Sequence, residues 1–402
     1  MRSTIGVAAI KSCNKSAVLA GEPAIIISNG LEAEGIWGKM RVGIDAHMIG
    51  DHSGGNESYY SNILYNMTIP DGDEYYLFVK KGIDMSPYER GFKIVEFEEK
   101  SAFKRNFMEL PKLCKKYKLD LLHTQYFIPF NRSCPVICTI HDICFEHYKD
   151  IFTKKEYIRQ KLLIPYAAKH STYIFTVSNH AKNDIMEHYH VPEEKVIVTY
   201  NAVSDDFRKL SVEELDAKSL RNQFGIKEDY ILSVCNLQPR KNLIRLIKAF
   251  RKLKENTSCH EQLVIVGKKA WMFNDILKEA LSGADDVIFT DYVGRDDLIR
   301  LYNDAKIFVY PSFFEGFGIP PLEAMACDTP VAVADATSLP EVVGDAGMYF
   351  DPFNVDEMAH SMQKLLRDGE YRDELVKKGA DQVKKFSWKE SADIITSHYR
   401  KI

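Results

Sequence analysis

The segment KIFVYPSFFEGFGIPPLEAMAC, residues 306–327, decides the fold. A short apolar run is followed by a turn with two glycines and then by an apolar helical pattern that opens with Pro320 and Pro321. Proline fits the first turn of a helix, and glycine lets the backbone approach a ligand closely. This order of strand, glycine-rich turn and helix is typical of a parallel α/β sheet whose turn exposes backbone N–H groups to a phosphate.

Short apolar runs alternate with helical patterns on both sides of this segment. Downstream of residue 229 the strand-like runs are 230–237, 262–268, 286–293, 306–312 and 330–335. Upstream they are 41–46, 75–80, 119–124, 135–142, 173–178 and 195–200. Apolar runs separated by helices predict parallel sheets covered on both faces. We therefore predict an α/β protein with two Rossmann-like, doubly wound domains that face each other across a cleft.

The chain of 402 residues is too long for one hydrophobic core, and its pattern suggests where the domains begin and end. We expect an N-terminal extension outside the core and a first domain, then a charged connection without strands, a second domain, and a C-terminal helix that packs back on the first domain. These parts span residues 1–39, 40–204, 205–228, 229–384 and 385–402.

The composition excludes several classes of protein. A net charge of -4 gives no general reason to expect nucleic acid binding. No apolar run approaches the roughly 20 residues of a membrane-spanning helix. The eight cysteines form no CxxC pair, which fits a reducing cytoplasm better than a disulfide scaffold. We expect a cytoplasmic protein.

Two glutamates and two cations are the sharpest candidates for chemistry. Glu315 lies in the glycine-rich turn and Glu323 in the helix that follows, where both are placed to accept hydrogen bonds from sugar hydroxyls. Arg240 and Lys241 follow the strand 230–237 at a helix start, where cations are normally disfavoured by the helix dipole. A bound diphosphate would offset that penalty. Alone, each of these residues is more often an ordinary solvated charge.

The segment 308–347, with NLQPRKNL at residues 236–243 before it, closely resembles the retaining glycosyltransferases of group 1 (family 4), which have the GT-B architecture. The resemblance implies a metal-independent hexosyltransferase that uses a nucleotide sugar such as GDP-mannose or UDP-glucose as co-substrate and needs no cofactor. Arg240 and Lys241 would neutralise the donor diphosphate, Glu323 would hold the ribose and Glu315 the donor sugar. The loop formed by Gly316, Phe317 and Gly318 would face the sugar and the phosphate. Tyr292 and Val293 would lie beside the nucleobase. Ser338 and Leu339 match a loop near the diphosphate less specifically.

The first half of the chain supplies the opposite wall in this interpretation. Gly54 and Gly55 follow the first strand and resemble the family's loop over the donor phosphate. His141 ends the strand 135–142 and matches a histidine close to the donor sugar. His123 also ends a strand, and we expect it to be structural.

Other readings of the same residues remain open. The segment HDICFEH, residues 141–147, offers ligands for zinc, but no second cluster completes a tetrahedral set. Asp71 and Asp73 resemble the acidic pair of metal-dependent transferases, yet they precede a strand and fit turn chemistry. We therefore expect no metal site.

The basic segment FKRNFMELPKLCKKYKL, residues 103–119, has two interpretations. It resembles interfacial helices that reach lipid-linked acceptors, which would give a weak peripheral contact with the inner face of a membrane. The interpretation we favour from the sequence is a core helix with a solvated basic face.

A non-catalytic binding subunit and a dinucleotide-dependent oxidoreductase are the two alternatives to sugar transfer. A catalytically dead glycosyltransferase relative that serves as a binding subunit would lack the diphosphate cations or Glu315, which this chain retains. A dinucleotide-dependent oxidoreductase would carry GxGxxG after its first strand, which residues 41–60 lack. Sugar transfer to a carbohydrate or lipid-linked acceptor, in the synthesis of cell-surface polysaccharide or glycoconjugate, is the function that the resemblance implies.

Overall fold

The computed structural model describes residues 38–50, 54–268 and 286–402. Lys39–Ile402 forms one compact unit, whereas residues 1–37 of the expected extension lie outside the described residues. Lys39 contacts the first sheet, with its Nζ 3.0 Å from Oε1 of Glu74. Within the described ranges, no helix is both long enough and apolar enough to cross a membrane.

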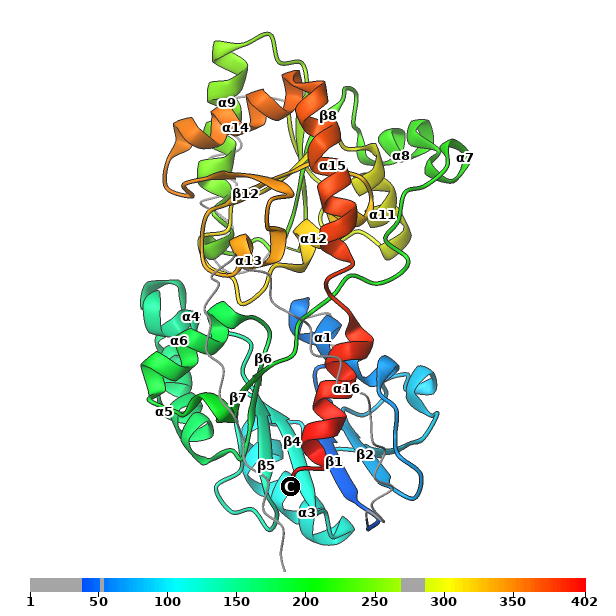
Figure 1. The fold of residues 1–402 in the computed structure, drawn as a ribbon, viewed down its shortest axis with the longest axis vertical. Coiled ribbons are helices and arrows are strands. Elements are labelled where there is room, and N and C mark those ends of the chain that lie inside the picture. The colour runs from blue at the N-terminus through cyan, green and yellow to red at the C-terminus, as the bar shows by residue number, and fades with distance from the viewer. Residues whose placement is uncertain (1–37, 51–53, 269–285) are drawn as a thin grey trace, which may run out of the picture. The chain divides into compact units, whose positions relative to one another are not determined.

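The first sheet has seven parallel strands in the order β3-β2-β1-β4-β5-β6-β7 (Figure 1). Its strands are rich in Val, Ile, Leu and aromatic residues, and the central ones are buried on both faces. They are β1 (Arg41–Asp45), β2 (Glu74–Val79), β3 (Phe92–Glu96), β4 (Leu121–Gln125), β5 (Val136–Thr139), β6 (Ile174–Thr176) and β7 (Val196–Val198).

The second sheet has six parallel strands in the order β10-β9-β8-β11-β12-β13. They are β8 (Tyr230–Val234), β9 (Gln262–Val266), β10 (Val287–Phe289), β11 (Ile307–Tyr310), β12 (Val331–Ala334) and β13 (Gly347–Phe350). The prediction of two doubly wound parallel sheets is confirmed. Two edge strands, β3 and β13, were missing from the predicted set.

Strand order reverses between β1 and β4 in the first sheet and between β8 and β11 in the second. Ligands of open α/β sheets bind at such switch points, outside the carboxyl ends of the strands. The loop after β8 carries Arg240 and Lys241, and the loop after β11 carries Glu315. Because β8 and β11 are neighbours in the sheet, the topology places these loops side by side.

Helices connect the strands of both sheets. In the first half they are α1 (Gly55–Asn66), α2 (Ala102–Lys104), α3 (Leu110–Tyr117), α4 (Cys144–His147), α5 (Lys154–His170) and α6 (Asn179–Tyr189). A π-helical turn, η2 (Arg105–Glu109), joins α2 to α3. In the second half they are α9 (Leu243–Asn256), α11 (Arg295–Asp304), α12 (Ile319–Ala326), α13 (Leu339–Val343), α14 (Val355–Arg367) and α15 (Gly369–Val383).

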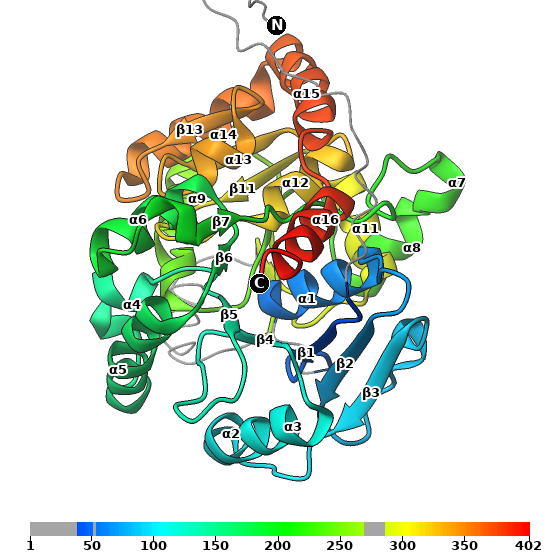
Figure 2. The same ribbon diagram turned by 60° about the horizontal axis from the view of Figure 1, so that its bottom comes forward.

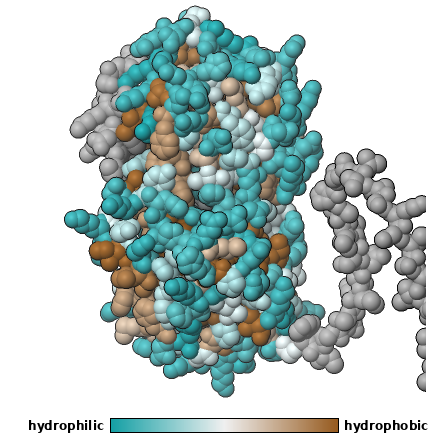
Figure 3. Space-filling view, turned by 60° about the vertical axis from the view of Figure 1, so that its left-hand side comes forward, coloured by the Kyte–Doolittle hydropathy of each residue, from teal (hydrophilic) through white to brown (hydrophobic). Residues whose placement is uncertain are grey.

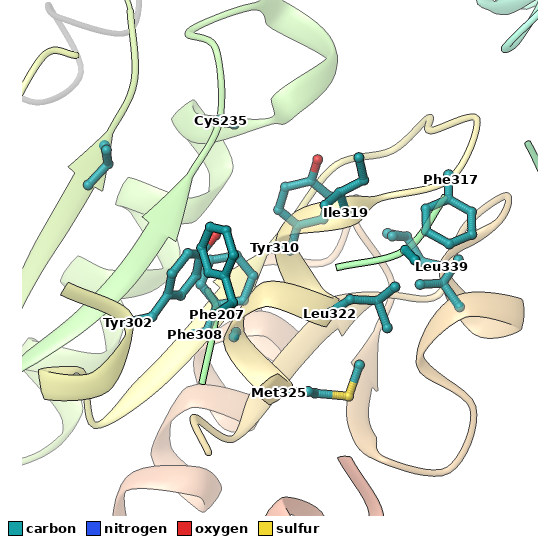
Figure 4. Close-up of a cluster of buried hydrophobic side chains, with 14 of the residues drawn as sticks. Phe207, Cys235, Tyr302, Phe308, Tyr310, Phe317, Ile319, Leu322, Met325 and Leu339 are labelled. Atoms are coloured by element: carbon teal, nitrogen blue, oxygen red, sulfur yellow. The ribbon is translucent and has the colours of Figure 1, made fainter. Parts of the chain in front are cut away.

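The charged connection over residues 205–228 holds two short helices, α7 (Val212–Leu215) and α8 (Ala217–Phe224). It packs on the second sheet's core: Phe207 contacts Tyr302, with ring centroids 5.9 Å apart, and Arg221 pairs with Asp304 at 2.7 Å. Figure 4 shows Phe207 grouped with Tyr302 and Phe308. The connection is therefore part of the second core's surface and not a free linker.

Helix α16 (Trp388–Tyr399) lies along α1 and contacts the first sheet (Figures 1 and 2). The Tyr399 hydroxyl lies 2.6 Å from Nδ1 of His123, and Arg400 pairs with Asp73 at 2.5 Å. The Ser391 hydroxyl donates to the backbone carbonyl of Tyr200. A segment that follows the second sheet in the chain thus completes the packing of the first.

Candidate functional site

Glu315 is the centre of a charged cluster at the carboxyl end of β11. Its carboxylate is almost fully buried. Oε2 accepts a hydrogen bond of 2.7 Å from Nη1 of Arg240, and Oε1 accepts one of 2.9 Å from the Tyr310 hydroxyl. Lys241 Nζ and the Ser312 hydroxyl also donate to Oε1. Two cations thus contact one buried carboxylate at the switch point of the second sheet.

A short 3₁₀ turn after β8, Pro239–Lys241, places the two cations. Asn242 ends this turn in the left-handed conformation (φ 59°). Its side-chain amide donates to the carbonyls of Pro311 and Pro352, at 3.1 and 2.6 Å. Helix α9 begins at Leu243, so both cations directly precede the helix that follows this turn.

The cluster changes the charge state of its members. Burial opposes ionisation of Glu315, but Arg240 and Lys241 outweigh it and hold the pKa of this carboxyl at about 2. Burial, helped by the neighbouring Arg240 charge, lowers the pKa of Lys241, and Glu315 opposes that shift. Burial also raises the pKa of Asp142, which Arg240 counteracts. The site therefore contains a carboxylate that is ionised at neutral pH and held by two cations.

The loop from Gly316 to Gly318 is pinned between the two halves of the unit. A Cβ on Gly316 would lie 2.5 Å from the carbonyl oxygen of His141, so only glycine fits this approach. The Ser178 hydroxyl donates to the Gly316 carbonyl at 2.6 Å, and the Ser338 hydroxyl lies 2.8 Å from the Phe317 carbonyl oxygen. Gly318 has a φ of +100°, which a side chain would strain.

Phe317 points away from the charged cluster. Its buried ring contacts the rings of Phe386 and Tyr200, at centroid distances of 5.4 and 6.2 Å. Figure 4 shows its side chain beside Leu339. Phe317 can therefore offer a ligand only its backbone, and its side chain holds the loop in place.

His141 follows β5 and is buried. Its Nε2 lies 2.7 Å from the amide nitrogen of Gln125, so with this placement of the amide Nε2 accepts and the ring proton is on Nδ1. Burial lowers the pKa of His141 to about 3, which keeps the ring neutral at pH 7. Its ring packs edge-on against Tyr59 and next to Tyr126.

His123, the lesser histidine candidate, lies deeper in the first core. Both ring nitrogens have protein partners: Tyr399 at 2.6 Å and Thr139 at 2.7 Å. This arrangement fits the structural role expected for it.

Glu323 lies on α12, separate from the Glu315 cluster. Its Oε2 accepts a hydrogen bond of 2.8 Å from the Tyr302 hydroxyl. Burial raises the pKa of Glu323 to about 7, while the hydrogen bond from Tyr302 and the charge of Arg295 oppose the rise. The two glutamates of the motif thus differ: Glu315 is ionised at neutral pH, whereas Glu323 titrates near pH 7.

The remaining candidates lie around this cluster. Gly54 precedes α1, and a Cβ there would lie 3.1 Å from Nδ2 of Asn236, so the loop after β1 reaches the loop after β8. Gly55 begins α1 and is exposed. Tyr292 is largely exposed, with Lys268 Nζ 4.7 Å from its ring centroid, whereas the Val293 side chain is buried in the second core. Only the Val293 backbone can therefore contact a base.

The residues considered as zinc ligands separate. His141 contacts Gln125, His147 contacts Asp184 at 2.8 Å, and Glu146 pairs with Lys161. Among the described residues, no group of three or more His, Cys, Asp or Glu side chains is arranged to hold a metal ion.

Several site residues were not anticipated from the sequence. Tyr310 and Ser312 donate to Glu315, and Thr337 accepts from the Glu315 backbone N–H at 3.0 Å. Thr337 has a φ of +50°, which is rare for a β-branched residue and marks a constrained loop. The signal available for Tyr310 and Ser312 was their place at the carboxyl end of the same strand that leads to Glu315.

A family model described as glycosyl transferases group 1 matches residues 216–382, and one described as glycosyltransferase family 4 matches residues 70–207. The chain is 34% identical over 284 residues to O-antigen chain mannosyltransferase B of Escherichia coli, covering 68% of this chain and 72% of that protein. It is 31% identical over 274 residues to the serotype-specific mannosyltransferase WbdA of Escherichia coli, covering 66% of this chain but only 33% of WbdA.

A solved structure of similar fold is that of HepE from Anabaena in complex with UDP-glucose. Its TM-score is 0.71 with 16% sequence identity, and the match covers 90% of this chain and 100% of that chain. At this identity the likeness concerns the fold alone.

Proposed function

The chain belongs to the group 1 glycosyltransferases, and from this premise we propose that it transfers mannose from GDP-mannose to a hydroxyl of a carbohydrate acceptor with retention at the anomeric carbon. The choice of mannose rests on relatives named as mannosyltransferases. UDP-glucose is the second donor to test.

The observation that carries the proposal is the pairing of Arg240 and Lys241 with Glu315 at the switch point of the second sheet. A donor diphosphate carries negative charge that grows as the bond to the sugar breaks. Preorganised cations beside the leaving group stabilise that charge in the transition state. We propose that Arg240 and Lys241 bind the diphosphate, and that Glu315 contacts the sugar hydroxyls.

We propose a transfer step with retention, as the resemblance to the family implies. The bond between the anomeric carbon and the diphosphate oxygen breaks, and a bond from the acceptor oxygen to the same carbon forms on the same face. The acceptor proton moves to the departing diphosphate oxygen. His141, neutral and positioned by Gln125, lies beside the donor sugar in this proposal. The product would keep the anomeric configuration of the donor, which the proton NMR spectrum of the product reports.

We propose that no metal and no resident cofactor take part, because Arg240 and Lys241 supply positive charge where a cation would otherwise bind. We also propose that the enzyme works in the cytoplasm on an acceptor of the cell-surface polysaccharide type, at the inner face of the membrane. This setting is suggested by relatives named for O-antigen synthesis.

GDP-mannose should stabilise the purified protein against heat more than UDP-glucose and far more than mannose alone. A ligand that binds only the folded state raises stability with the logarithm of its concentration over its dissociation constant. Thermal unfolding with each compound at equal concentration, with and without EDTA, measures this. EDTA should leave the GDP-mannose shift unchanged. If no nucleotide or nucleotide sugar stabilises the protein, the proposed function is wrong.

Binding of GDP-mannose should strengthen about tenfold between pH 6 and pH 8, because only ionised Glu323 accepts hydrogen bonds from both ribose hydroxyls. The pKa of about 7 means that the carboxyl is mostly protonated at pH 6 and mostly ionised at pH 8. Calorimetric titration at several pH values measures the effect. Glu323→Gln is the control, since its affinity should be weaker and independent of pH over this range. A wild-type affinity that does not vary with pH would exclude the assigned role of Glu323.

A further inference from the structure

An exposed apolar surface covers part of the first half of the chain, away from the charged cluster. Phe103 and Leu162 are about two-thirds exposed, at 65% and 67%. We call this surface the apolar face and define it by Phe103, Phe107, Met108, Phe130, Ile158 and Leu162. Figure 3, which brings the α5 side of Figure 1 forward, shows apolar side chains gathered on its lower half. Large exposed apolar patches mark interaction sites on soluble domains.

The apolar face is continuous across three segments of chain. Ring centroids lie 5.0 Å apart for Phe103 and Phe107, and 4.8 Å apart for Phe107 and Phe130. Phe130 in turn lies 4.9 Å from Tyr166 on α5. Helix α5 adds Ile158 and Leu162, which precede Tyr166 by eight and four residues and therefore share its side of the helix. Scattered single apolar residues would need no explanation, but this contiguous set does.

The π-helical turn η2 lies within this part of the apolar face. Each residue of a π-helix rotates the chain less than in an α-helix, so five such residues shift the preceding helical face by roughly a quarter turn. Phe103, just before this turn, and Met108 within it are exposed, while Arg105 and Asn106 are buried. One polar atom of each, Arg105 Nε and Asn106 Oδ1, has no hydrogen-bond partner there. Local structure thus buries polar groups and exposes apolar ones, the reverse of what folding favours. This segment is part of the predicted core helix with a solvated basic face, and that prediction is wrong for residues 103–108.

Cations share the outer side of α5 with the apolar residues. Lys155, Arg159 and Lys169 recur with Ile158 and Leu162 at steps of three and four, so all five project from one side. Helix α5 holds five Lys or Arg residues against one Glu, although the whole chain carries a net charge of -4. Among the described residues, no carboxylate forms an ion pair with any of these three cations.

The loop after β4 links the apolar face to the candidate site. Tyr126, at the start of this loop, packs on His141 with ring centroids 5.6 Å apart. Arg159 of α5 lies over the ring of the next residue, Phe127, at 5.5 Å. Phe130, at the end of the same apolar stretch, belongs to the apolar face. An acceptor whose lipid part rests at the apolar face could thus present its sugar toward His141 along one loop.

We propose that the apolar face docks on an anionic lipid bilayer, with the aromatic and aliphatic side chains entering the interface and Lys155, Arg159 and Lys169 contacting lipid phosphates. Apolar anchors together with cations on one face are the two attractions that hold interfacial elements to anionic membranes. The inference extends the proposed function, because it assigns a membrane-bound acceptor to the same site. The cations select a lipid surface over a second copy of this chain, whose matching face would present like charges.

Vesicle co-sedimentation of the full chain tests this proposal. The wild-type protein should bind vesicles that contain about 30% of the anionic lipid phosphatidylglycerol. It should bind vesicles of pure phosphatidylcholine much more weakly. Phe103→Ser combined with Met108→Ser and Leu162→Ser should lower the partition coefficient about tenfold or more. Lys155→Gln combined with Arg159→Gln should lower it about fivefold for each cation removed, and added salt should mimic that loss.

Tyr65→Ser combined with Val212→Ser is the matched control, because both residues are highly exposed but lie on α1 and α7. This variant should bind vesicles as the wild type does. Equal binding by all variants, or no binding by the wild type, would overturn the proposal. A different occupant of the face would also overturn it: light scattering would then show a wild-type dimer that does not bind vesicles, and the triple serine variant of the apolar face would be a monomer. Thermal stabilisation by GDP-mannose, measured on the same samples, tests the proposed function separately, so that either can fail alone.

Discussion

Arg240→Ala and Lys241→Ala are each expected to lower the turnover number by on the order of 10²–10³, the usual cost of removing one group that stabilises developing charge. Both cations contact Glu315 at the end of β11, in the place assigned to the donor diphosphate. Because negative charge on the diphosphate grows only as the glycosidic bond breaks, the loss should appear in kcat more than in donor affinity. Steady-state kinetics with GDP-mannose varied at saturating acceptor measure the two effects.

Lys248→Ala provides the control for this experiment. Lys248 is exposed on α9, seven residues beyond Lys241, and its removal takes away one positive charge without touching the cluster. Turnover by this variant should stay near the wild-type value. Wild-type turnover in both Arg240→Ala and Lys241→Ala would mean that the donor binds elsewhere.

Glu315→Gln is expected to lower the free energy of unfolding by about 3 kcal/mol at pH 7. The pKa of this carboxyl falls from 4.5 to about 2 on folding, and each unit corresponds to about 1.4 kcal/mol. The folded-state pKa lies below the unfolded value, so the stabilisation is complete above about pH 4.5 and is lost as the pH falls toward 2. The difference between the two proteins should therefore shrink to about half at pH 3.

Urea unfolding of both proteins at pH 7 and pH 3 measures this difference. Glu187→Gln, which changes an exposed glutamate on α6, should leave the free energy of unfolding unchanged at both pH values. If Glu315→Gln lowers the free energy of unfolding equally at pH 7 and pH 3, the stabilisation by Glu315 comes from its packing and not from its charge. Turnover should also fall, because the amide leaves Lys241 without its buried counter-charge.

The grouping of Arg240, Lys241 and Glu315 was predictable because parallel strands end at one edge of their sheet. The runs 230–237 and 306–312 are recognisable as buried strands, and the charged residues directly follow each. What the sequence did not reveal is that Glu315 is ion-paired with both cations, since that depends on the turn ended by Asn242. Short-range patterns do not specify such a turn.

Side-chain direction was the other limit of the sequence. Phe317 and Val293 lie in motifs that suggest ligand contact, yet both side chains are buried in the core. The neighbouring residues in the sequence do not determine whether the side chain of a loop residue points to the core or to a ligand. Similarly, the pattern over residues 103–119 predicts a regular helix, whereas the π-helical turn that follows Phe103 is accompanied by hydrogen bonds of Glu109 and Arg105 to residues 98–100.

The path of α16 bears on how the chain is made. His123 and Asp73 of the first half receive their partners Tyr399 and Arg400 only after the ribosome has produced the whole second sheet. Domains tend to fold as they emerge, the earlier one first. Here part of the first domain's core stays uncovered until α16 has been synthesised. A nascent chain stalled before residue 388 should therefore contain all strands of the second sheet but an incompletely packed first domain. Such a chain should bind chaperones.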